Sequence, residues 1–166
     1  LTGILRRGDM AGKGGSTLLL HGTPGIAAGR VLLVGLGKEA EFGEKAYRDA
    51  VAATVRALKD AGSRDVLITL SELAVAGRNA AWRVRQGKLA IHDAFFRSGQ
   101  RKSKKDDSKP ALDAFAFSVA GKDARSATVA LAQGEAIAQG MNLARELGNL
   151  PANFCTPTYL AQQAQR

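Results

Sequence analysis

Short β-branched or leucine-rich runs alternate with longer segments of helical periodicity, and this alternation constrains the fold of the chain most strongly. Apolar runs bounded by turn residues predict strands, and they occupy residues 17–21, 30–35, 65–70 and 112–119. Strands that alternate with helices form mostly parallel sheets, because each crossover helix packs back onto the sheet. We therefore predict an α/β fold with a mixed, mostly parallel sheet covered by helices on both faces.

The first long helix is predicted over residues 43–61, where apolar positions recur every three or four residues from Tyr47 to Leu58. Gly62 follows as a stop signal, because glycine readily adopts the left-handed conformation that ends many helices. A single apolar stripe predicts a helix that packs on one surface.

A second helix, predicted over residues 79–97, carries two apolar stripes at about 100° per residue. One stripe holds Ala81, Val84, Ile91 and Phe95, the other holds Trp82, Leu89 and Phe96, and between them lie Arg85, Lys88 and His92. A helix packed only on its own sheet does not normally place three polar groups within its buried arc. We therefore predict that the stripe of Trp82, Leu89 and Phe96 contacts another subunit or another domain.

The alanine-rich segment 126–147 predicts a third helix, in which Gly134 and Gly140 allow a neighbouring backbone to approach closely. Gly148 is expected at the left-handed position past its end, and Pro151 prevents resumption. Thr156 and Pro157 form a helix start, with a capping hydroxyl followed by a proline in the first turn. These signals predict a domain over residues 1–121, an interdomain helix over 122–148 and the beginning of a second domain over 149–166.

The junction between these helices reads Ala144-Arg145-Glu146-Leu147-Gly148-Asn149-Leu150-Pro151-Ala152-Asn153-Phe154-Cys155-Thr156-Pro157. It resembles the corresponding junction of the leucyl aminopeptidase (cytosol aminopeptidase) family. Further segments similar to the family lie at residues 5–9, 17–21, 30–39 and 77–86, so the resemblance extends in order over nearly the whole chain. It implies a macro-domain-like N-terminal domain, with a first strand before Leu1 and the catalytic domain after Arg166.

The family removes N-terminal amino acids from peptides with two divalent metal ions, Mn or Zn. The resemblance places their aspartate, glutamate and lysine ligands in the C-terminal domain, around an Asn-Thr-Asp-Ala-Glu-Gly-Arg signature that residues 1–166 do not contain. We therefore expect no catalytic residue, metal ligand or cofactor in this segment, and no activity from it alone. The implied partners are its own catalytic domain, other subunits of a homo-hexamer and the peptide substrate.

Nucleic-acid binding is an alternative, because some bacterial relatives combine it with peptidase activity. The formal net charge is +9, from 24 basic and 15 acidic residues, and a basic excess favours polyanions. A basic loop predicted over residues 98–110 would carry this function with its flanks, through Arg97, Arg101, Lys102, Lys104, Lys105 and Lys109. The alternative explanation of this positive charge is that a segment need not have the same charge balance as the whole protein.

A third hypothesis, nucleotide or ADP-ribose binding, depends on macro-domain analogy and on the Gly35-Leu36-Gly37 turn between a strand and a helix. Such turns can bind a pyrophosphate through backbone N–H groups, but Glu39 and Glu41 would repel that anion. The competing interpretation is a tight turn.

A single cysteine, Cys155, excludes an internal disulfide framework and fits a reducing compartment. No apolar run reaches the length needed to cross a bilayer. We therefore predict a cytoplasmic protein without membrane contact.

Overall fold

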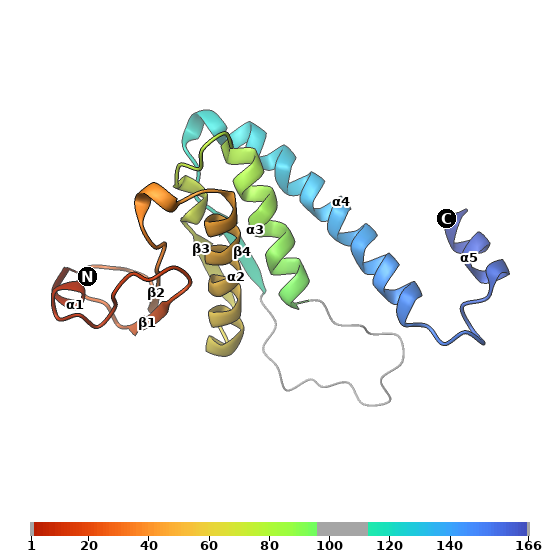
Figure 1. The fold of residues 1–166 in the computed structure, drawn as a ribbon, viewed down its shortest axis with the longest axis horizontal. Coiled ribbons are helices and arrows are strands. Elements are labelled where there is room, and N and C mark those ends of the chain that lie inside the picture. The colour runs from red at the N-terminus through yellow and green to blue at the C-terminus, as the bar shows by residue number, and fades with distance from the viewer. Residues whose placement is uncertain (1, 96–112, 166) are drawn as a thin grey trace.

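The structure, a computed structural model, describes residues 2–95 and 113–165. In chain order its elements are α1 (Thr2–Arg6), β1 (Thr17–His21), β2 (Arg30–Val34), η1 (Glu39–Glu41), α2 (Glu44–Ala61), β3 (Asp65–Ile68), η2 (Leu70–Glu72), α3 (Ala80–Phe95), β4 (Ala114–Phe117), η3 (Gly121–Asp123), α4 (Ala124–Asn149) and α5 (Pro157–Ala164). Figure 1 shows α3 between α2 and the long α4, with the β1–β2 hairpin on one side and α5 at the far end. The predicted mixed α/β class is confirmed, and all four predicted strands form.

The described strands pair as two two-stranded sheets rather than as one mostly parallel sheet. β1 and β2 are antiparallel, with Leu19 opposite Leu32, because the connection over residues 22–29 is too short for a parallel crossover. β3 and β4 are parallel, with Val66 opposite Phe115, and α3 lies in the connection between them. Apolar runs identify strands, but the connections determine their direction.

Helices cover one face of β3–β4 within the described residues, whereas coverage of both faces was predicted. Val66 and Ile68 belong to the core beneath α2 and α3. Leu67, between them, is 66 % exposed. This alternation along β3 is the pattern of a sheet with one open face.

The described helices α2 and α5 end and begin at the residues predicted from the sequence, whereas α4 ends later than predicted. Gly62 adopts a left-handed conformation at the end of α2, with φ of 61°. Thr156 caps α5, since its hydroxyl oxygen accepts a hydrogen bond from the Tyr159 backbone N–H at 3.2 Å. Gly148, however, remains inside α4, which continues to Asn149 and ends at Leu150 in an extended conformation. Pro151 explains this end, because proline disfavours helical geometry in the residue before it.

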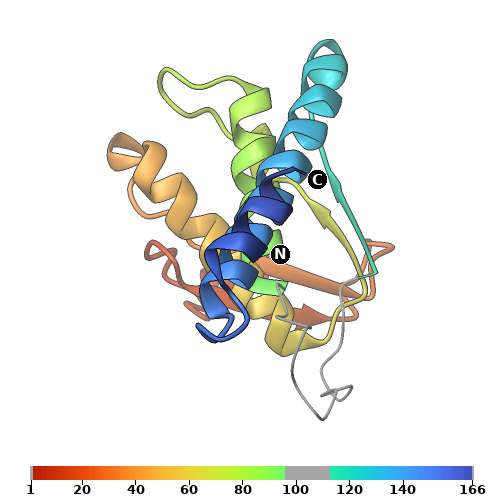
Figure 2. The same cartoon turned by 90° about the vertical axis from the view of Figure 1, so that its right-hand side faces the viewer.

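Two apolar clusters hold the domain together on either side of α3. The first contains Tyr47 and Val51 of α2, Ile68 of β3, and Trp82 and Ile91 of α3. The second joins Val84 of α3 to Ala127 and Ala130 of α4. Figure 2, turned by 90°, also places α3 between α2 and α4. α3 therefore packs on two surfaces of its own chain.

Candidate functional site

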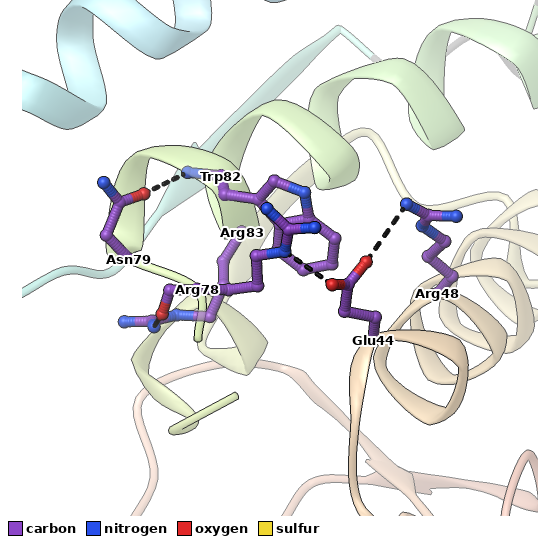
Figure 3. Close-up of polar contacts among 6 residues, drawn as sticks. All are labelled: Glu44, Arg48, Arg78, Asn79, Trp82 and Arg83. Carbon is purple, nitrogen blue, oxygen red and sulfur yellow. Dashed lines mark hydrogen bonds and ion pairs between the residues drawn. The ribbon is translucent and has the colours of Figure 1, made fainter. Parts of the chain in front are cut away.

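Trp82 lies at the contact between α2 and the beginning of α3, where cationic groups surround its ring (Figure 3). Its centroid is 5.6 Å from that of Tyr47. The guanidinium carbons of Arg48 and Arg78 lie 5.5 Å and 5.3 Å from the ring centroid, within the range of cation–π attraction. Glu44 pairs with Arg78 at 2.6 Å and with Arg48 at 3.5 Å. One carboxylate therefore orients both cations against the indole.

Hydrogen bonds fix the start of α3 below this cluster. The Asn79 side-chain oxygen accepts from the Trp82 backbone N–H at 2.9 Å, as a helix cap does. Arg83 donates to the Ser71 carbonyl at 2.7 Å, and its own carbonyl accepts from the Tyr47 hydroxyl at 3.0 Å. Burial raises the pKa of Tyr47 to about 12, because the phenolate would lose its hydration.

The predicted contact stripe separates into parts with different environments. Trp82 is 8 % exposed and belongs to the core of its own chain, so its main partner is α2. Leu89 is half-buried and lines a surface hollow of about 370 Å³ bordered by α2, α3 and α4. Phe96 lies outside the described residues.

The three polar residues between the stripes of α3 face α4. Arg85 donates to Gln133 at 2.9 Å, and Lys88 pairs with Glu135 at 2.5 Å. The His92 Nε2 atom lies 2.5 Å from Asn142 Nδ2. We name this set the polar seam: Arg85, Lys88 and His92 on α3, with Gln133, Glu135 and Asn142 on α4. Hydrogen bonds from Lys88 and then Gln139 lower the pKa of Glu135. The three polar residues of α3 therefore have hydrogen-bond or ion-pair partners within the chain.

Small residues let the two helices approach at the seam. A Cβ atom at Gly134 would lie 2.9 Å from Lys88 Cγ and 3.2 Å from Lys88 Cβ. At Gly140, by contrast, a Cβ atom would meet no described atom within 4 Å. Within the described residues, α3 therefore approaches α4 closely at Gly134, whereas the space beside Gly140 is open.

α4 also carries exposed apolar residues. Val129, Ile137 and Leu143 are 53 %, 45 % and 45 % exposed. At about 100° per residue these side chains fall within one arc, with Gly140 near its centre. This outer stripe of α4 is Val129, Ile137, Gly140 and Leu143. Only the tertiary structure separates it from the seam, because apolar and small residues occur on both sides of α4.

The backbone N–H groups of the Gly35 turn already donate hydrogen bonds to other residues of the chain. The Gly35 N–H donates to Ser16 at 2.8 Å and the Gly37 N–H to Gly12 at 3.0 Å. A Cβ atom at Gly35 would overlap the Lys13 carbonyl, and the helix α2 begins only at Glu44. These contacts favour a tight packed turn over a pyrophosphate site.

The basic residues proposed for nucleic-acid contact, from Arg97 to Lys109, lie outside the described residues. Among residues 2–95 and 113–165, no three His, Cys, Asp or Glu side chains group as metal ligands. No helix in these ranges is long and apolar enough to cross a bilayer.

A family model described as the N-terminal domain of the cytosol aminopeptidase family matches residues 1–105. Probable cytosol aminopeptidases of Paraburkholderia xenovorans and Dechloromonas aromatica are each 49 % identical to the chain over 166 residues, covering 100 % and 99 % of it. That of Stenotrophomonas maltophilia is 50 % identical over 162 residues, or 98 % of the chain. The chain spans about a third of these relatives, namely 33 %, 33 % and 32 % of their lengths.

Two solved structures share the fold. The bottromycin maturation enzyme BotP in complex with Mn has a TM-score of 0.70 at 26 % identity, covering 99 % of this chain and 32 % of BotP. A tomato leucine aminopeptidase mutant has a TM-score of 0.67 at 23 % identity, covering 99 % and 31 %. With the fold and the sequence matches in agreement, the chain belongs to the cytosol aminopeptidase family, whose N-terminal domain it contains.

Proposed function

We propose that this chain is the assembly part of a metal-dependent leucyl aminopeptidase that removes N-terminal amino acids from peptides in the cytoplasm. Its relatives carry aminopeptidase names over the full length of the match, and they are about three times as long as the chain. The catalytic chemistry is assigned to polypeptide beyond residues 1–166. There, two divalent ions, Mn or Zn, would activate water and polarise the scissile carbonyl.

The outer stripe of α4 is the observation that carries the assembly role. Its exposed apolar side chains lie on a helix already held against α3 by the Lys88–Glu135 pair and by close packing at Gly134. Exposed apolar patches mark interaction surfaces, and Gly140 at the centre would let a partner backbone approach. We assign this stripe to contact with the catalytic domain, within a homo-hexamer.

Charge insertion in the full-length protein tests this assignment. Ile137→Lys should lower Mn²⁺-dependent hydrolysis of a leucine amide and shift sedimentation toward smaller species, because a lysine would be buried without a partner. Thr128→Lys is the matched control, since Thr128 is exposed on the opposite side of α4. Normal hydrolysis and sedimentation of Ile137→Lys would rule out the stripe as an assembly surface. The isolated chain should not hydrolyse the substrate with either metal.

The nucleic-acid and nucleotide hypotheses gain no support from the relatives named above. The basic loop remains a prediction that salt-dependent DNA retention can test.

A further inference from the structure

The surface hollow beside Leu89 brings together one face of each of three helices. It has a volume of about 370 Å³ and is lined by Arg48 and Val51 of α2, by Gln86, Leu89, Ala90 and Asp93 of α3, and by Met141 and Arg145 of α4. On each helix successive lining residues are one, three or four positions apart, the spacing that keeps side chains on one side of a helix. The volume lies at the lower end of the range of small-ligand pockets, about 300–1,000 Å³, so the hollow suits a small molecule.

The floor of this hollow is apolar. Val51 is 4 % exposed and belongs to the core cluster of α2 and α3. Leu89 and Met141 are half-buried. An apolar side chain of a ligand would therefore be stabilised here, because it would leave water for an apolar surface.

The rim of the hollow carries charges of both signs. The Asp93 carboxylate accepts a hydrogen bond from the Arg145 guanidinium. Arg48 is oriented by Glu44 at 3.5 Å and by the Trp82 ring, whose centroid lies 5.5 Å from its guanidinium carbon. A guanidinium has five N–H donors and a carboxylate has about four acceptor positions. These groups can therefore keep their partners and also bind a ligand.

The combination of floor and rim selects one class of ligand. The two guanidinium groups attract a carboxylate and repel a purely cationic molecule, whereas Asp93 attracts an ammonium group and repels a purely anionic one. The apolar floor accepts a hydrocarbon group. An α-amino acid with an apolar side chain carries the carboxylate, the ammonium and the hydrocarbon group on a single carbon atom.

We propose that this hollow binds a free α-amino acid with an apolar side chain, such as leucine. Its carboxylate would pair with Arg48 and Arg145, its ammonium with Asp93, and its side chain would lie over Leu89 and Met141. The binding chemistry depends on the described residues alone. That the ligand is an amino acid released by the protein itself depends on the proposed function, and the domain would then bind the product of the reaction.

NMR spectroscopy of the full-length protein with isotope-labelled methionine methyl groups tests the proposal. The protein is loaded with Zn²⁺, which is diamagnetic, and the Met141 resonance is identified by its loss in Met141→Leu. Addition of L-leucine should shift this resonance in a saturable manner. L-Leucinol, which lacks the carboxylate, and isocaproate, which lacks the ammonium, should each bind about fivefold more weakly, the loss expected for one exposed ion pair.

Arg48→Gln should weaken leucine binding by a similar factor of about fivefold. Arg56→Gln is the matched control, because Arg56 is exposed on the same helix and does not line the hollow. Equal weakening by the two variants would overturn the proposal. The comparison of the three ligands needs no variant, so it decides the question even if Arg48→Gln does not fold.

The proposal would also be overturned if leucine produced no saturable shift of Met141, or if leucine, leucinol and isocaproate bound equally well. The same preparation is assayed for hydrolysis of a leucine amide. Hydrolysis without a Met141 shift contradicts the amino-acid site alone, and a saturable shift without hydrolysis contradicts the proposed function alone.

Discussion

Lys88 of α3 reaches across the helix contact and pairs with Glu135 of α4 at 2.5 Å. The Lys88 side chain is only 13 % exposed, and a buried charge is tolerated when it is paired. This pair, with its neighbours in the polar seam, explains why α3 carries charges between two apolar stripes. The seam sets the register of α3 on α4, so the outer stripe of α4 is presented in a defined direction.

Glu135→Gln should remove an acid-sensitive contribution to stability. The pKa of Glu135 is lowered from its ordinary value of 4.5, first by the hydrogen bond from Lys88. A lowered folded-state pKa stabilises the protein above the unfolded pKa, and this contribution is lost as pH falls through the folded value. The difference in free energy of unfolding between wild type and variant should therefore be largest above about pH 5 and shrink toward pH 3. Urea denaturation across this range measures it, and a pH-independent difference would contradict the pairing.

Leucine at the two glycines of α4 should have opposite consequences in the isolated chain. Gly134→Leu should destabilise it by about 1–3 kcal/mol, because Lys88 occupies the space that the side chain needs. Gly140→Leu should leave stability unchanged or raise it by up to about 1 kcal/mol, since glycine is a poor helix former. Thermal unfolding of both variants distinguishes them. Equal destabilisation would show that the outer stripe is packed within the chain.

Trp82→Ala should cost about 3–5 kcal/mol of stability, as deletions of buried aromatic side chains do. The loss includes the contacts with Tyr47, Arg48 and Arg78. Trp82→Phe should retain much of the packing and weaken mainly the cation–π contacts. Denaturant titration of the chain checks both values. If Trp82→Ala left the free energy of unfolding of the isolated chain unchanged but dissociated the full-length oligomer, Trp82 would have the predicted intersubunit role instead.

Tyr47→Phe should flatten the loss of stability at high pH. The folded pKa of Tyr47 is raised to about 12, so an unfolded tyrosine ionises first as pH rises above about 10. Wild-type stability should then fall by up to about 3 kcal/mol between pH 10 and pH 12 relative to the variant. At neutral pH the variant should lose about 1 kcal/mol with the hydrogen bond to Arg83. Denaturant titrations of both proteins at pH 7 and pH 11 provide the comparison. If the free energy of unfolding changed equally with pH in wild type and variant, the Tyr47 hydroxyl would be hydrated rather than buried.

Local rules in the sequence determined the fold class, the four strands and the long helices, because apolar periodicity and turn residues act over a few neighbouring positions. They also predicted the Thr156 cap. The family resemblance came from the residues of the junction and of the segments before it. The end of α4 was misplaced at Gly148, since the restriction that Pro151 imposes on Leu150 outweighs a glycine that can also remain helical.

Only the tertiary structure decided what each face of a helix contacts. The periodicity of α3 revealed two stripes and a polar arc, yet it could not show that Trp82 packs on α2 and that Lys88 and His92 meet α4. Gly134 and Gly140 look alike in the sequence, but only Gly134 lies against another helix. Such contacts join residues dozens of positions apart, and their geometry depends on how whole elements dock, which no local pattern encodes.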